Sequence, residues 1–187
     1  MIKKLSYICF SLLVFLDKIF KIITKRSILI WFNDFIQERS YKSIKILGKE
    51  IKFFVPNQLL EWRVDTYFSK EPETLEWIDS FQEKENLIFW DIGANIGLYS
   101  IYNSLKHPKS TTIAFEPSSS NLRVLTRNIS INNLEKNIKV ISMPLTNKKV
   151  KSLSIEVNEN FKEYYNKILN LMNKYEFKLL HKKTMRK

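Results

Sequence analysis

The stretch of residues 89–100 constrains the fold more than any other part of the chain. An apolar run, residues 87–90, leads into Asp91, and Gly93 and Gly97 follow before apolar residues recur at helical spacing. Glycine reaches backbone conformations that are closed to other residues, and a tight turn needs such conformations. The stretch therefore predicts a buried strand, a tight turn and the start of a helix, with the exposed N–H groups of that helix beside the turn.

Strand-like and helix-like segments alternate from residue 87 onward. Strands are predicted at 87–91, 111–115 and 137–141, separated by helices at 97–105 and after the possible N-caps 118–120. The face of the second helix is set by Leu122, Leu125, Ile129 and Leu134. Alternation of this kind is typical of a parallel sheet with right-handed crossovers. The predicted fold class is α/β, a Rossmann-like sheet with helices on both faces.

The connection after the third strand is unusual. Residues 141–152 contain Pro144 and a lysine-rich run but no helical periodicity, and the next strand-like segment is 153–157. A parallel crossover usually needs a dozen or more residues that include a helix. The sheet is therefore predicted to be incomplete. A helix at 161–174 and a strand at 177–180 would close it.

The N-terminal residues have the outline of a signal peptide, with a basic start and an apolar run at 5–16. The run is far shorter than the ~20 residues that span a bilayer, and Asp17 and Lys18 follow with no small-residue cleavage site. Residues 1–25 instead predict a basic amphipathic helix. It could lie on an anionic membrane surface or pack on the domain, and its largely apolar circumference indicates that something covers it.

Between this helix and the sheet, a second apolar stretch at 28–36 precedes alternating segments at 43–47 and 51–55, which predict a β-hairpin. A helical lead-in follows, with Pro72 in a first helical turn. Its aromatic residues are expected to pack on the coming domain: Trp62, Tyr67, Phe68, Trp77 and Phe81. The predicted organisation is a helical segment at 1–42, a hairpin and lead-in at 43–86, the Rossmann-like domain at 87–181 and a basic tail at 182–187.

Composition limits the classes of partner. The chain of 187 residues is 44% hydrophobic, enough for one core with appendages, and its 31 Lys and Arg against 19 Asp and Glu give a net charge of +12. This excess fits either an anionic partner or a solvated basic surface. We favour the surface, and expect no specific nucleic-acid binding, because no basic run is interleaved with aromatic residues. The lone Cys9 predicts no disulfide and no cysteine metal site, which fits a reducing, cytoplasmic compartment.

The turn itself distinguishes two classes of cofactor. A dinucleotide-binding turn typically has the sequence G-x-G-x-x-G. Here Asn95 replaces the middle glycine, and Asp91 would repel a pyrophosphate. S-adenosylmethionine carries an ammonium and a sulfonium, which an acid favours. Glu116, at the end of the second strand, could accept hydrogen bonds from both ribose hydroxyls, and the turn N–H groups could bind the methionine carboxylate. The predicted cofactor-binding residues are Asp91, Gly93, Ala94, Asn95, Gly97 and Glu116.

Three segments together resemble the FkbM-type family of S-adenosylmethionine-dependent methyltransferases: residues 91–100, including Asp91-x-Gly93-Ala94-Asn95-x-Gly97, then 114–117 and 128–133. Residues 71–77 also look like the lead-in of bacterial members. The resemblance covers residues 53–147 and resumes at 151. It implies O-methylation of a small-molecule or glycan acceptor, such as a sugar, a polysaccharide precursor or a secondary metabolite.

The chain departs from that family between residues 147 and 151. Family members carry a fourth strand there with an Ile-Asp-Val-Glu/Asp-Gly type motif, and no such residues are present. Without it, one edge of the first strand is unpaired unless the 153–157 strand takes its place. No catalytic base is identified, because His107 and His181 are expected at the surface. Two alternatives stay open: a non-catalytic, internally deleted remnant, and a nicotinamide-dependent enzyme, which Asn95 disfavours.

Overall fold

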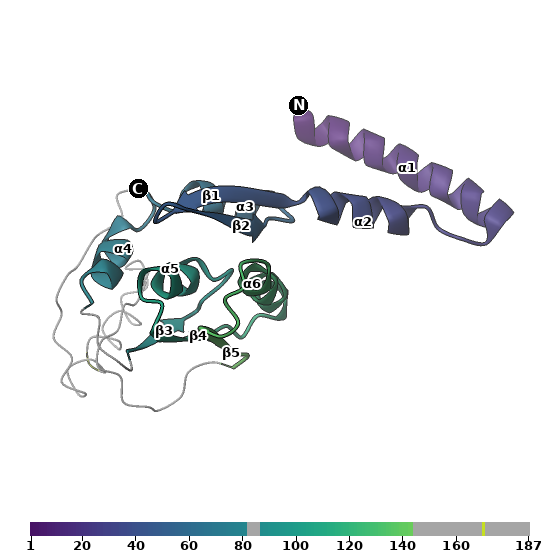
Figure 1. Cartoon of the computed structure of the whole chain (residues 1–187). Coiled ribbons are helices and arrows are strands. Elements are labelled where there is room, and N and C mark those ends of the chain that lie inside the picture. The colour runs from purple at the N-terminus through teal and green to yellow at the C-terminus, as the bar shows by residue number, and fades with distance from the viewer. Residues whose placement is uncertain (82–86, 144–169, 171–187) are drawn as a thin grey trace. The chain divides into compact units, whose positions relative to one another are not determined.

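The computed structural model describes residues 1–81, 87–143 and Asn170 (Figure 1). The chain divides into two units, Met1–Leu145 and Thr146–Lys187. The strands predicted at 153–157 and 177–180 and the tail at 182–187 lie outside the described residues. So does the helix predicted at 161–174, except for Asn170, which is helical.

The central sheet has three parallel strands in the order β3-β4-β5: Ile88–Ile92, Thr111–Phe115 and Ile138–Ile141. Helix α5, Leu98–Lys106, connects the first two strands, and α6, Ser119–Ile131, connects the last two. Each strand begins and ends within one residue of its prediction. The fold class is therefore α/β and Rossmann-like, as predicted; helices on the second face, also predicted, are not among the described elements.

The two crossover helices cover the same face of this sheet (Figure 1). The connections from β3 to β4 and from β4 to β5 run in the same direction across the sheet. Because parallel crossovers share one handedness, both helices lie on the same side. The β3 side chains that face them, Phe89 and Asp91, are buried, whereas Ile88 and Ile92 on the other face are 58% and 37% exposed. Within residues 1–81 and 87–143, that second face is partly open and β3 pairs with β4 alone.

The predicted hairpin is present as β1, Tyr41–Ile46, and β2, Lys49–Phe54. Its turn consists of Leu47 at φ 49° and Gly48 at φ 79°. Two positive φ angles give the mirror-image turn whose twist matches a hairpin. The prediction that Leu47 belongs to the strand was wrong, since it forms the turn, and the hairpin begins two residues earlier than predicted.

The lead-in consists of α3, Gln58–Asp65, and α4, Pro72–Asp79. Asn57 caps α3, because its Oδ1 accepts a hydrogen bond from the Leu60 N–H at 3.0 Å. Pro72 lies in the first turn of α4, as predicted.

The aromatic residues of the lead-in do not all pack inward. Tyr67 is buried, and Trp77 and Phe81 pack against the core. The prediction was wrong for Trp62 and Phe68, which are 47% and 49% exposed. Trp62 is on the outer side of α3 because the inner side is taken by Leu60 and Val64.

The N-terminal helices are α1, Ile2–Thr24, and α2, Leu29–Arg39. They are joined through Asp17, whose Oδ1 accepts hydrogen bonds from Ser27 Oγ at 2.7 Å and from the N–H groups of Ile28 and Leu29 at 2.8 and 3.3 Å. Burial by itself raises the pKa of this carboxyl, but the hydrogen bonds, including one from Lys21, outweigh it and lower the pKa to about 2. Asp17 therefore holds the start of α2 at the end of α1.

The expectation that α1 is covered is wrong for the described part of the chain. Asp17 is its one buried residue, and its large apolar side chains are mostly exposed. The helix is amphipathic, as predicted. Among the described helices, none combines the length and apolar character that crossing a membrane requires.

Asn128 of α6 connects the hairpin to the domain. It is completely buried; its Oδ1 accepts a hydrogen bond from the Phe54 N–H at 2.7 Å and its Nδ2 donates one to the Ile96 carbonyl at 2.9 Å. One turn later, Asn132 makes a similar pair of bonds to the main chain of Lys52, at 3.0 and 2.8 Å, in a less buried position. Strand β2 is thus attached to α6 by two asparagines.

Asn128→Ala is expected to lower the free energy of unfolding by about 3 kcal/mol, because it leaves a buried N–H and a buried carbonyl without partners. Asn132→Ala is the matched control, and a loss of about 1 kcal/mol is expected because water can replace its bonds. Urea unfolding of both variants makes the comparison. Equal losses would show that Asn128 does not carry the attachment.

Candidate functional site

The turn after β3 is held by the end of β4. The N–H groups of Gly93 and Ala94 both donate to the Phe115 carbonyl, at 2.9 and 3.0 Å. Three residues of the turn have left-handed backbone: Gly93 at φ 77°, Asn95 at φ 53° and Gly97 at φ 86°. Asparagine tolerates this region better than most residues with a side chain. The predicted tight turn therefore exists, and it depends on the neighbouring strand.

These bonds determine which N–H groups a ligand could meet. Gly93 and Ala94 donate to β4, Asn95 donates to Glu116 at 2.8 Å, and Gly97 donates to the Ala94 carbonyl at 2.8 Å. The next donors belong to the first turn of α5, which begins at Leu98 with Gly97 as its N-cap. Since the first N–H groups of a helix have no partner inside it, those of Leu98 and Tyr99 are the ones placed to bind an anion.

The two glycines of the turn have different surroundings. A Cβ on Gly97 would lie 2.6 Å from Leu125 Cδ1, so this glycine allows α6 to pack closely on the turn. A Cβ on Gly93 would meet nothing within 4 Å. Gly93 therefore borders open space beside the main chain.

Asp91 lies beneath the start of α5. Its Oδ2 accepts a hydrogen bond from Ser100 Oγ at 2.6 Å, and the side chain is buried. Burial raises the pKa of the carboxyl to about 6, against the lowering effect of the hydrogen bonds from Ser100, and the charge of Glu116 raises it further. An ionised Asp91 is thus costly unless a positive charge comes close.

Glu116 joins the ends of β3 and β4. It is 4% exposed, its Oε2 accepts from the Asn95 N–H at 2.8 Å, and its Oε1 accepts from the Ser118 N–H at 2.8 Å. Each carboxylate oxygen can accept a second hydrogen bond, so a ligand hydroxyl would share the oxygen with a backbone N–H. Glu116 therefore also shapes the turn, which its sequence position did not predict.

Neither Asp91 nor Glu116 forms an ion pair with a described basic residue. The ion pairs in this region are Lys70 with Glu71 and Lys106 with Asp79. In the same turn, Asn95 Oδ1 is buried without a hydrogen-bond partner. The site thus combines two buried carboxylates, an unsatisfied amide oxygen and free N–H groups at a helix start. This arrangement suits a ligand that carries positive charge, hydroxyl groups and a carboxylate.

Several residues around the turn were not predicted. Tyr67 donates its hydroxyl hydrogen to the Leu98 carbonyl at 3.2 Å, and Tyr99 donates to Glu71 Oε2 at 2.7 Å. Burial raises the pKa of the Tyr99 hydroxyl far above its usual range. Ser100 is one of three buried polar residues of α5, with Asn103 and Ser104, so its type alone did not single it out. The tyrosine contacts join segments distant in sequence.

The prediction that His107 is a surface residue was wrong. It is buried at the end of α5, where its Nε2 lies 2.9 Å from the Ile78 carbonyl and its ring lies beside Phe81. This contact fixes the end of α4, so the histidine has a structural role. His181 lies outside the described residues.

Two curated proteins are similar to this chain. A methyltransferase of Sordaria araneosa, sdnD, is 34% identical over 80 residues, which cover 43% of this chain and 31% of that protein. Methyltransferase 1 of Beauveria bassiana is 39% identical over 44 residues, covering 24% of this chain and 18% of that protein. The chain therefore spans less than a third of the length of either relative. No family model matches the chain.

Among solved structures, the S-adenosylmethionine-dependent methyltransferase of Agrobacterium tumefaciens superposes with a TM-score of 0.43 and 16% identity, over 55% of this chain and 32% of that one. At this TM-score the likeness supports no argument. The parallel strand order β3-β4-β5, its register and its helical connections define the fold.

The pH dependence of stability tests the position of Asp91. Its pKa is raised from 3.8 to about 6, so between these values the folded protein retains a proton that the unfolded chain releases. The contribution of Asp91 to stability is present below about pH 4 and is lost as the pH rises to about 6, which removes about 3 kcal/mol. The Asp91→Asn variant has no carboxyl at this position, so its stability does not undergo this decrease with rising pH.

We therefore expect the stability of Asp91→Asn relative to the unmodified protein to increase by about 3 kcal/mol from about pH 4 to pH 7. Chemical unfolding across this range measures the difference. Asp34→Asn, at an exposed position on α2, is the control for the substitution itself and is expected to have a small effect on stability. A pH-independent difference for Asp91→Asn would contradict a buried, proton-retaining carboxyl.

Proposed function

We propose that the chain binds S-adenosylmethionine at the 93–97 turn and is a methyltransferase of FkbM type. The observation that carries the proposal is the pair of buried carboxylates, Asp91 and Glu116, which flank the turn without a basic partner among the described residues. A cofactor with an ammonium and a sulfonium would supply the missing positive charge. The identity to two methyltransferases supports the same activity.

Each part of the cofactor has a candidate partner in the site. Asp91 would bind near the positive charges, and the resulting attraction would lower its raised pKa. Glu116 would accept hydrogen bonds from the ribose hydroxyls through its remaining lone pairs. The N–H groups at the start of α5 would bind the methionine carboxylate, where the helix dipole favours an anion. Gly93 leaves room for the cofactor beside the main chain.

A dinucleotide fits these residues less well. Its pyrophosphate would meet two buried carboxylates, and like charges in a poorly solvated site repel strongly. The N–H groups of Gly93 and Ala94 that could offset this already donate to Phe115. A nicotinamide-dependent enzyme would therefore gain support only if NAD stabilised the protein and S-adenosylmethionine did not.

The reaction that we propose is O-methylation of a sugar, a polysaccharide precursor or a metabolite. It is supported by the resemblance of residues 91–100, 114–117 and 128–133 to the FkbM-type family. Bound S-adenosylmethionine supplies an electrophilic methyl group, and the protein must hold the acceptor oxygen in line with it.

We also propose that an internal segment with the fourth strand is missing at residues 147–151. The sequence there lacks the family motif, and this favours a second candidate, a cofactor-binding remnant without turnover. Incubation with labelled S-adenosylmethionine and sugar acceptors separates the two: labelled product supports the enzyme, and binding without product supports the remnant.

Titration calorimetry with S-adenosylhomocysteine tests the cofactor. This product retains the ammonium, the carboxylate and the ribose. Glu116→Gln is expected to weaken its binding at least tenfold, or about 1.5 kcal/mol, because a charged acceptor is lost. Glu135→Gln is the control, since it makes the same charge change at an exposed position in the turn after α6. Failure of the unmodified protein to bind, or equal affinities of the two variants, would contradict the proposed site.

A glycine comparison tests where the cofactor lies. Gly93→Ala and Gly48→Ala both place a Cβ at a positive φ, 77° and 79°, with nothing within 4 Å. Each should therefore cost a similar strain, about 1–2 kcal/mol, measured by urea unfolding. Only Gly93→Ala should also weaken S-adenosylhomocysteine binding, by roughly tenfold or more. Unchanged affinity of Gly93→Ala would show that the space beside this glycine is not used.

A further inference from the structure

We propose that α1 lies in the plane of an anionic membrane surface and attaches the protein to it. Six apolar residues recur at helical spacing along one side of the helix, here called the apolar face: Leu5, Ile8, Leu12, Phe15, Ile19 and Ile22. Their side chains are between 43% and 73% exposed. A continuous exposed apolar surface of this kind marks an interaction site in a water-soluble structure.

The contact between the two N-terminal helices uses the opposite side of α1. Asp17 is buried against the start of α2, and Leu13 and Val14, close to it on the helix surface, are half-buried. Because the contact with α2 uses Leu13, Val14 and Asp17, the apolar face, which lies on the opposite side of the helix, points away from α2. Packing of α1 on α2 therefore leaves the apolar face without a partner in the described residues.

The charges on α1 identify the kind of partner. Its charged residues are Lys3, Lys4, Asp17, Lys18 and Lys21, and Asp17, the one acid, is buried and paired with Lys21 at 3.0 Å. The exposed charges of the helix are thus all positive. A second copy of the same helix would meet like charges beside its apolar face, whereas an anionic lipid surface would attract the lysines and accept the apolar side chains.

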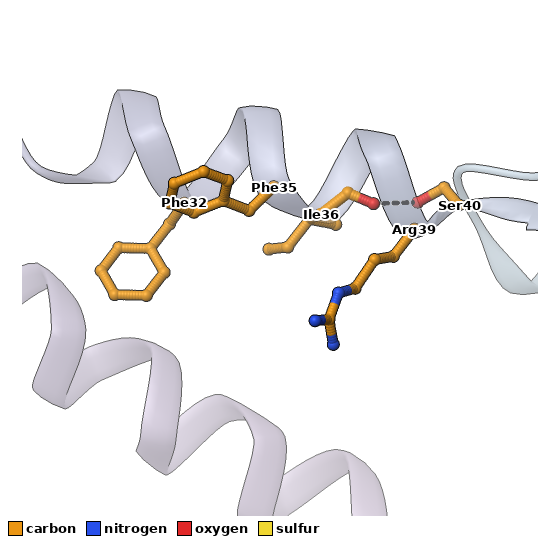
Figure 2. Close-up of a pocket in the computed structure, with 5 residues that line it drawn as sticks. All are labelled: Phe32, Phe35, Ile36, Arg39 and Ser40. Atoms are coloured by element: carbon orange, nitrogen blue, oxygen red, sulfur yellow. Dashed lines mark hydrogen bonds between the residues drawn. The ribbon is translucent and has the colours of Figure 1, made fainter.

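Helix α2 carries a similar combination of residues, on the side that is turned toward the purple α1 ribbon in Figure 2. Figure 2 shows Phe32, Phe35, Ile36 and Arg39 projecting from one side of α2, where they line a shallow hollow. The hollow is lined by α2 alone and is separate from the 93–97 turn. Exposed aromatic rings and an arginine on one side are a combination suited to the boundary between lipid headgroups and acyl chains.

Co-sedimentation with vesicles tests the proposal on the full chain. We expect the protein to sediment with vesicles of phosphatidylcholine and phosphatidylglycerol in equal parts, and much less with phosphatidylcholine alone. Raising the salt concentration should release it, since the lysines contribute through screened charge. Lys4→Gln/Lys18→Gln should weaken binding to the anionic vesicles by roughly fivefold for each lysine removed.

The apolar face is tested with neutral substitutions. Leu12→Gln/Phe15→Gln should abolish sedimentation, whereas Ser6→Gln/Ser11→Gln, at exposed positions of the same helix, should retain it. Thermal melting and sedimentation velocity of each variant test two other partners for the apolar face, namely another part of this chain and a second copy of it. The proposal is overturned if the unmodified protein does not bind the anionic vesicles. It is also overturned if the Leu12 and Phe15 substitutions instead lower the melting temperature or dissociate a dimer. No step uses the cofactor, so the outcome is independent of the proposed function.

Discussion

The buried side chain of Asn128 holds together the parts of the structure that form the site. Its amide joins the edge of β2 to the Ile96 carbonyl, and Ile96 lies inside the 93–97 turn. Because both bonds are buried, neither group has water as an alternative partner, and the hairpin and the turn must keep their relative position. The hairpin, which contributes no residue to the candidate site, thereby becomes part of its support.

The site itself is assembled from the ends of two parallel strands. The Phe115 carbonyl accepts two N–H groups from the turn, and Glu116, the next residue, accepts a third. The same end of β4 therefore binds the turn twice, once through the main chain and once through a carboxylate. A ligand that competed for Glu116 would act on the turn as well, so binding of such a ligand would be coupled to the conformation of residues 93–97.

The sequence was sufficient where the determining interactions are local. Strand and helix positions follow from apolar periodicity and from the glycines, and the proximity of Asp91 and Glu116 follows from the parallel order of β3 and β4. The roles of Asn128 and His107 were not accessible in this way. Each depends on a main-chain group far along the chain, Phe54 for the asparagine and Ile78 for the histidine. The exposure of α1 could not be predicted either, because an apolar helix is equally compatible with a protein partner and with lipid.

Helix α6 connects the candidate site to the N-terminal helices. Besides Asn128, it carries Arg127, whose Nε donates to the Tyr41 hydroxyl at 2.7 Å and whose guanidinium lies 4.0 Å from the centre of the Phe54 ring. Arg127 also reaches Gln37 in the last turns of α2, at 3.5 Å. One helix thus contacts the turn through residue 128 and the end of α2 through residue 127. A force on the N-terminal helices would act on the same helix that positions Ile96, so α6 links the end of α2 to the 93–97 turn.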